Sequence, residues 1–157
     1  MAYEYKQGFF KPKNPQKYRG DPTNIVYRSG WEKSVMKWLD ETSTVTGWSS
    51  EEIVVPYISP IDNRPHRYFV DFYVEAIGRD GRTKNILIEV KPAAQTREPK
   101  KRQRKTKQYI SEVMTWGVNQ AKWKAAQEYC ADRGWEFQIL TEHEIPGTGA
   151  PPKKTTK

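Results

Sequence analysis

The stretch Ile86–Pro92, ILIEVKP, places two charged side chains in an otherwise apolar run. Successive side chains of a β-strand alternate between its two faces, so Glu89 and Lys91 share one face. Ile88 and Val90 then point to the other face. A carboxylate and an ammonium group on a core strand are costly unless each is paired or binds a metal. The pattern therefore indicates a functional site, the alternative being an ordinary surface pair at the end of an edge strand.

A second acidic residue, Asp71, interrupts the preceding apolar strand at 67–77. The residues GRDGRT between the two strands predict a hairpin. A three-residue loop, Arg79-Asp80-Gly81, would place Asp71 directly opposite Glu89 on the same face, whereas a two-residue loop would miss it. Gly81 favours the longer loop, whose last residue is left-handed. Facing Cβ atoms are about 4.5–5.5 Å apart and the two carboxylates repel, so we expect a divalent cation between them.

This ordered set of residues resembles the core of the PD-(D/E)XK nucleases, with Asp71, then Glu89-Val90-Lys91 on the next strand, and Glu32 on a preceding helix. The catalytic residues that the resemblance implies are Glu32, Asp71, Glu89 and Lys91. The ligands that it implies for Mg²⁺ or Mn²⁺ are Asp71, Glu89, the backbone carbonyl of Val90, and Glu32. Lys91 would orient or activate the attacking water. One departure from the family pattern is that Val70, and not proline, precedes Asp71.

Three other stretches extend the resemblance over about residues 1–145: YEYKQGFF at 3–10, YRSGWE at 27–32 and NQAKW at 119–123. They are similar to the head completion proteins of contractile-tailed, T-even-type phages. The core also resembles the transposon-end endonuclease branch of the nuclease superfamily. The resemblance implies a Mg²⁺- or Mn²⁺-dependent DNA endonuclease that acts on packaged DNA. Its partners would be DNA and the portal or neck proteins, in the host cytoplasm or the head-neck region of the virion, as a monomer or homodimer.

Glu32 has a second interpretation. The residues Ser29-Gly-Trp-Glu32 form a capping box, in which the glutamate reaches back to the backbone amide of Ser29. Both interpretations place the start of this helix beside the site.

The net charge of +8 is concentrated in three basic segments. Residues 1–20 contain five basic residues and one acidic residue. Residues 97–107 contain seven basic residues and one acidic residue, and residues 151–157 add three lysines. The central run follows the catalytic strand, which favours contact with DNA phosphates. Its predicted DNA-binding residues are Lys100, Lys101, Arg102, Arg104, Lys105 and Lys107. The alternative is a solvated charge block without a ligand.

Composition favours a soluble, cytoplasmic protein. The hydrophobic fraction is 36%, but 6 Trp, 9 Tyr and 5 Phe among 157 residues supply enough apolar area for a core. No apolar run approaches the roughly 20 residues that span a bilayer, and the N-terminus lacks the order of a secretory signal. The single cysteine, Cys130, excludes an internal disulfide and a cysteine-built zinc site, and it fits an inert core position.

The pattern of apolar residues predicts an α/β (α+β) fold with a mixed central sheet of about four strands flanked by helices. We expect helices at about 29–41, 106–114 and 118–132, and strands at 52–59, 67–77, 84–91 and 135–141. The first helix would bury Trp31, Val35, Trp38 and Leu39. The expected organisation is a basic aromatic N-terminal arm at 1–23, a nuclease-like domain at 24–145 and a disordered basic tail at 146–157.

Other functions remain open at this stage. A head-completion plug that binds DNA or portal without cutting would bind in a salt-dependent way that is indifferent to metal. A Holliday-junction or transposon-end nuclease would share the chemistry and differ in substrate. His66 with Asp62 could bind a metal or act as a base, although a loop histidine more often does neither.

Overall fold

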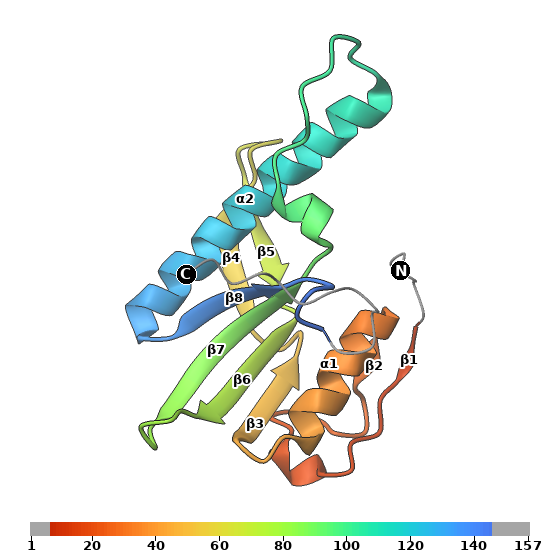
Figure 1. The fold of residues 1–157 in the computed structure, drawn as a ribbon. Coiled ribbons are helices and arrows are strands. Elements are labelled where there is room, and N and C mark those ends of the chain that lie inside the picture. Colours follow the sequence, from red (N-terminus) through yellow and green to blue (C-terminus); the bar gives the residue numbers. More distant parts are fainter. Residues whose placement is uncertain (1–6, 146–157) are drawn as a thin grey trace.

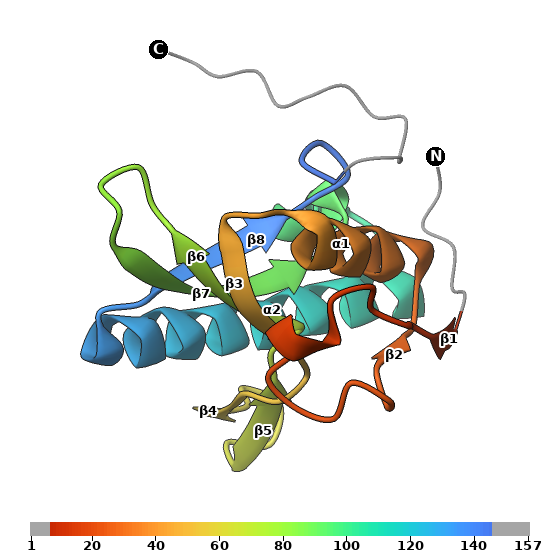
Figure 2. The ribbon, with the colours of Figure 1, turned by 90° about the horizontal axis from the view of Figure 1, so that it is seen from below.

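The computed structural model describes residues 7–145, and its centre is a mixed sheet in the order β3-β6-β7-β8. Its strands are β3 (Val45–Ser50), β6 (Phe72–Ile77), β7 (Thr83–Val90) and β8 (Glu136–Leu140). The first three pair antiparallel, and β8 runs parallel to β7. Helices α1 (Gly30–Glu41) and α2 (Lys107–Arg133) cover opposite faces of this sheet (Figures 1 and 2). The predicted mixed sheet flanked by helices is therefore confirmed.

Alternating residues of the central strands pack into two separate hydrophobic cores. On β7, Ile88 and Val90 belong to the core under α1, whereas Leu87 belongs to the core under α2. The same alternation holds on β6, where Phe72 packs toward α1 and Tyr73 toward α2. Both faces of the sheet are covered by helices, and apolar side chains on both faces of β7 follow from this. Glu89 and Lys91, in phase with Leu87, consequently lie on the α2 side.

Two small ribbons flank the central sheet. Strands β4 (Val54–Ile58) and β5 (Pro65–Phe69) form an antiparallel ribbon that packs against α2. Strands β1 (Gly8–Phe9) and β2 (Val26–Tyr27) form a second, shorter one. Two 3₁₀ helices, η1 (Pro15–Lys17) and η2 (Ala93–Thr96), complete the elements. No helix within residues 7–145 combines the length and apolarity needed to cross a membrane.

The chain before α1 is fixed to that helix and to the edge of the sheet. The Lys17 ammonium donates to the backbone carbonyls of Leu39, Asp40 and Thr42, which satisfies the last turn of α1. Tyr18 is buried and stacks edge-on against Trp48, with ring centroids 4.8 Å apart. The boundaries of the predicted N-terminal arm and domain stay predictions, and the predicted tail at 146–157 lies outside the described residues.

Several predicted elements were wrong in extent. The strand β3 was not predicted, and the single strand predicted at 67–77 is wrong, since β5 ends at Phe69 and β6 begins at Phe72 in a different sheet. The two predicted helices at 106–114 and 118–132 form one continuous helix, α2. In α1, Trp38 is 49% exposed, and Met36 is buried in its place.

Candidate active site

The hairpin between β6 and β7 has the predicted register. Pairs run from Phe72–Ile88 to Ile77–Thr83, and the Gly78 amide donates to the carbonyl of Arg82 at 2.8 Å. The loop is therefore the predicted three residues, ending at Gly81 with a φ of 78°. Continued by one step, this register sets Asp71 opposite Glu89. The paired ladder stops one step earlier, at Phe72, because the backbone bends at Asp71.

Asp71 lies at this bend, beside the end of β7. Its Oδ2 accepts a hydrogen bond of 2.8 Å from the backbone amide of Val90. In an extended strand the N–H and C=O of one residue point to the same neighbouring strand. The carbonyl of Val90 is consequently directed to the same edge of β7 as the amide that Asp71 binds.

Glu32 caps α1, as one of the two interpretations expected, while its role as a metal ligand stays a prediction. Ser29 is the N-cap of α1, and its Oγ accepts from the Glu32 amide at 3.1 Å. The Glu32 carboxylate accepts in return from the Ser29 hydroxyl at 3.0 Å and from the Arg28 amide at 3.3 Å. This side chain is only 7% exposed, yet it also faces Asp71. The capping interactions fix the position of a carboxylate that belongs to the site.

Glu51 is a third acidic residue here, and the sequence analysis missed it. It follows the last residue of β3, and its amide donates to the carbonyl of Asp71 at 3.1 Å. Between the pairs Ser50–Phe72 and Val54–Phe69, three residues lie opposite two, which is the arrangement of a β-bulge. Glu51, the first of the three, has a left-handed φ of 55°. Such strained positions occur often at functional sites.

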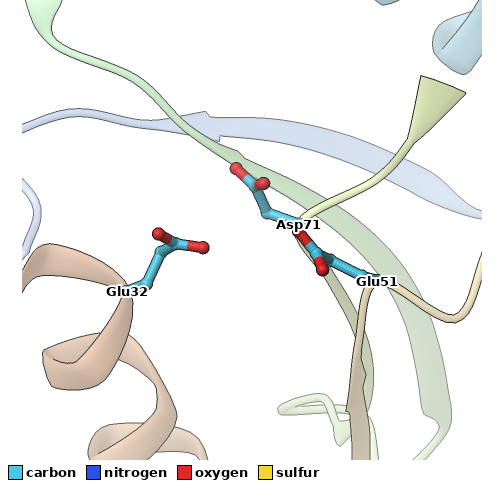
Figure 3. A group of neighbouring side chains, drawn as sticks. All are labelled: Glu32, Glu51 and Asp71. Atoms are coloured by element: carbon cyan, nitrogen blue, oxygen red, sulfur yellow. The ribbon is translucent and has the colours of Figure 1, made fainter. Parts of the chain in front are cut away.

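One carboxylate oxygen from each of Glu32, Glu51 and Asp71 lies within 4.8 Å of the other two. The three side chains come from α1, the end of β3 and the start of β6, and they face a common space (Figure 3). An all-oxygen set of this kind suits a hard divalent cation such as Mg²⁺. The residues present therefore fit the metal that the sequence implied.

Burial opposes the ionised forms of Asp71 and Glu32. It raises the pKa of Asp71 to about 7, an effect that the charges of Glu32 and Glu51 reinforce and the Val90 amide and Lys91 oppose. Asp71 keeps part of its surface accessible, but protein atoms surround it on most sides. Burial likewise raises the pKa of Glu32. Without a cation, the site favours protonated carboxyl groups.

Glu89 lies apart from this group, on the α2 side of the sheet. It is 5% exposed, and the hydroxyl of Tyr68, on β5, donates to its Oε2. Burial raises the pKa of Glu89, and the charges of Lys91 and Lys122 oppose that rise. The charge of Glu32 also contributes to raising the pKa of both Glu89 and Asp71. The acids on the two sides of the sheet therefore interact electrostatically. A role for Glu89 as a metal ligand stays a prediction.

Lys91 lies between the acidic residues and a pocket beside α2. Its charge lowers the pKa of both Asp71 and Glu89. It also lines a pocket of about 590 Å³ together with Lys107 and Lys122 of α2. The lysine is thus placed where an anionic group in the pocket would meet the carboxylates.

The predicted DNA-binding run leads into α2 and is exposed along its length from Lys100 to Lys107. Lys107, the first residue of α2, is the member of this run that lines the pocket of Lys91. DNA binding by the other five residues stays a prediction. His66 and Asp62 form an exposed pair at 2.7 Å on the β4–β5 ribbon, outside the carboxylate group.

A mixed four-stranded sheet between two helices is consistent with the fold of PD-(D/E)XK-like nuclease domains. Comparison with known sequences gives the family. Residues 42–142 match the family described as "TnsA-like endonuclease N terminal", and the chain belongs to that family. It is also 40% identical over 153 residues to the head completion nuclease of Enterobacteria phage T4, covering 95% of this chain and 97% of the relative.

Proposed function

We propose that this chain is a divalent-metal-dependent DNA endonuclease that hydrolyses phosphodiester bonds. The observation that carries the proposal is the gathering of Glu32, Glu51 and Asp71 within 4.8 Å, with the charge of Lys91 acting on the Asp71 carboxylate. Three acids this close together, one buried and two partly buried, repel one another unless a cation or protons neutralise them. Membership of an endonuclease family supports the same conclusion.

The proposed metal ligands lie at one end of the central sheet, on both of its faces. Asp71, Glu32, Glu89 and the carbonyl of Val90 would hold Mg²⁺ or Mn²⁺, and the structure adds Glu51 to that set. When bound, the cation would neutralise phosphate oxygens and lower the pKa of the attacking water.

The chain's own residues would bind and position the substrate. Lys91 lines the neighbouring pocket, where its ammonium would hold a phosphate oxygen or stabilise the charge that develops there. The exposed run from Lys100 to Lys107 would contact backbone phosphates, which carry little sequence information. We therefore expect weak sequence preference.

The biological substrate in this proposal is packaged phage DNA during head completion. The support is the similarity to a head completion nuclease over 95% of the chain. DNA and the portal or neck proteins would be the partners, and the protein would act in the host cytoplasm or at the head-neck region of the virion.

Plasmid nicking tests the enzymatic proposal. The purified chain should nick supercoiled DNA with Mg²⁺ and not with EDTA, and both Asp71→Asn and Lys91→Met should lose this activity. Lys84→Met is the matched control, because Lys84 lies on the same strand, is exposed and stands far along β7 from the acids. Equal nicking by all four proteins would refute the proposal. Salt-sensitive DNA binding that is indifferent to metal and to Asp71 would favour the non-catalytic plug.

A further inference from the structure

The first twelve residues of α2, Lys107–Val118, include no buried side chain. The buried residues of this helix begin at Asn119 and continue with Trp123, Ala126 and Cys130. The first half extends beyond the sheet and runs beside the chain that follows η2 (Figure 1). It exposes the apolar side chains of Ile110 and Met114, at 47% and 44%. An extended helix with uncovered apolar side chains is a binding surface when a ligand of matching chemistry exists.

Two pockets lie against this half of α2. The first, of about 590 Å³, is lined by Lys91, by residues of α2 and by Ile61, which follows β4. The second, of about 550 Å³, lies between α2 and the segment that contains Gln95 and Arg97. Each is large enough for a ligand of nucleotide size. The residues that both pockets share are Ser111, Thr115 and Asn119.

Asn119 is a donor that lacks an acceptor where the two pockets meet. The residue is 5% exposed, and its Nδ2 has no hydrogen-bond partner among residues 7–145. Trp116, in the wall of the second pocket, likewise has an unpaired indole nitrogen within that range. A buried donor without an acceptor is unfavourable, so each is satisfied when a ligand supplies an oxygen or nitrogen acceptor.

The lining of the first pocket combines cations with apolar side chains. Lys91, Lys107 and Lys122 supply positive charge, and the aliphatic lining consists of Ile61, Ile110, Met114 and Val118. Intact duplex DNA presents phosphates on its outside and keeps the faces of its bases stacked within. A single strand presents both phosphates and base faces, the combination that cationic grooves with stacking surfaces bind. Trp116 offers a stacking surface of this kind in the second pocket.

We propose that the two pockets beside α2 bind an unpaired segment of DNA, with phosphates at the lysines and bases against the apolar wall. The preferred substrate is then DNA with a single-stranded or frayed end, and not the interior of a duplex. This inference rests on the proposed function, because Lys91 joins the first pocket to the candidate active site.

Fluorescence anisotropy in EDTA measures this preference without cleavage. The labelled probes are a blunt duplex, the same duplex with a single-stranded overhang, and the single strand alone. The overhang and the single strand should bind about tenfold more tightly than the blunt duplex, the effect expected for stacking one or two bases. Met114→Glu should remove most of this preference. Val113→Glu is the matched control, since Val113 is equally exposed on the same helix but lines neither pocket.

A second pair of variants tests the phosphate contacts. Lys122→Met should weaken binding of the single strand by about fivefold and reduce its salt dependence, because one phosphate contact is lost. Lys124→Met should not, since Lys124 is exposed and outside both pockets. Tighter binding of the blunt duplex, tighter binding of an RNA strand of the same sequence, or equal effects of Met114→Glu and Val113→Glu would overturn the inference.

Cleavage assays with Mg²⁺ separate the two proposals. Efficient cutting within a blunt duplex, equal to that at an overhang, would leave the nuclease proposal standing and refute the preference for unpaired DNA. Preferential binding of the single strand in EDTA, without metal-dependent cleavage of any probe, would support the pockets and refute the nuclease proposal.

Discussion

Replacing Asp71 by asparagine should stabilise the metal-free protein at neutral pH. The asparagine keeps an acceptor for the Val90 amide and removes the charge that burial and the neighbouring acids oppose. In the folded chain the pKa of Asp71 is raised from 3.8 to about 7, whereas the unfolded chain has the ordinary value. Between these two pH values the folded state keeps a proton that the unfolded state has lost. The free energy of unfolding therefore falls as pH rises through this window and stays lower above it.

The two pKa values set the size of the effect. Their difference corresponds to roughly 4 kcal/mol at most. Asp71 is partly accessible, and its titration is coupled to that of Glu32 through their charges. We therefore expect the free energy of unfolding to fall by about 2 kcal/mol. For a chain of this size that equals roughly 4–8 °C in Tm. Thermal melts in EDTA from pH 4.5 to 8.5 should show this decline in the wild type and a flatter profile for Asp71→Asn.

Divalent metal should reverse the order of the two proteins. At pH 8, a cation present at about 100 times its Kd would stabilise the wild type by roughly 2.7 kcal/mol, and it would stabilise Asp71→Asn far less. Asp132→Asn is the control, since Asp132 is an exposed acid near the end of α2. If Asp71→Asn melts below the wild type at pH 8 in EDTA, or if Mg²⁺ raises both Tm values equally, the electrostatic account of the site is refuted.

Three further substitutions test residues that surround the candidate active site. Tyr68→Phe removes the hydroxyl that donates to Glu89 and should cost about 1–3 kcal/mol in urea denaturation at pH 8; an unchanged midpoint would mean that the bond contributes nothing. Ser29→Ala should cost about 1 kcal/mol and raise the Mg²⁺ concentration needed for nicking, because Glu32 loses a partner; an unchanged requirement would separate the cap from the site. Gly81→Ala should lower the free energy of unfolding by about 1–2 kcal/mol, because alanine is strained at the left-handed φ of this position, and it should leave nicking intact. A much larger loss of stability would mean that the alanine side chain clashes with the protein.

The sequence could predict β7 and its hairpin because local rules decide both. The alternation of side chains in 86–92 places Glu89 and Lys91 on one face in any strand, and Gly81 selects the loop that fixes the register. The N-cap at Ser29 also follows from a local pattern. Each of these features depends on residues within a few positions of one another.

The strand β3 could not be predicted, because its glycine is surrounded by residues that are distant in the sequence. Val45, Thr46 and Trp48 favour a strand, but Gly47 interrupts them and suggests a loop. In the fold, a Cβ at Gly47 would lie 2.7 Å from the side chains of both Arg19 and Glu75. These two form an ion pair at 3.1 Å across the strand. A side chain at position 47 would displace this ion pair, so the glycine leaves room for residues that are remote in sequence.

The continuity of α2 through Gly117 has a similar cause. Glycine within a helix costs about 1 kcal/mol, and the sequence analysis ended the first helix before it. The second half of α2 is anchored by Trp123, Ala126 and Cys130 in the core of the sheet face. Packing of that half offsets the local penalty, and the helix extends back to its Thr106 cap.

Glu51 escaped prediction because its role arises from an interruption of pairing. Two acids after two serines look like an exposed turn. The bulge opposite Val70 and Asp71 turns Glu51 toward the carboxylates, and only the three-dimensional pairing of β3 with β6 reveals that. A left-handed, non-glycine residue at the end of a strand was the structural signal, and no sequence rule identifies one.

The bend at Asp71 explains how helices on opposite faces of one sheet contribute to one site. Glu32 comes from α1, and Glu89 points to the face that α2 covers. An uninterrupted strand through Asp71 would have directed its carboxylate to the α2 face with Tyr73, away from Glu32. Because the chain leaves one sheet and enters another at this residue, the carboxylate lies at the sheet end, near Glu32 and bonded to the Val90 amide. The break in the strongest strand of the sequence is thus the feature that assembles the acids.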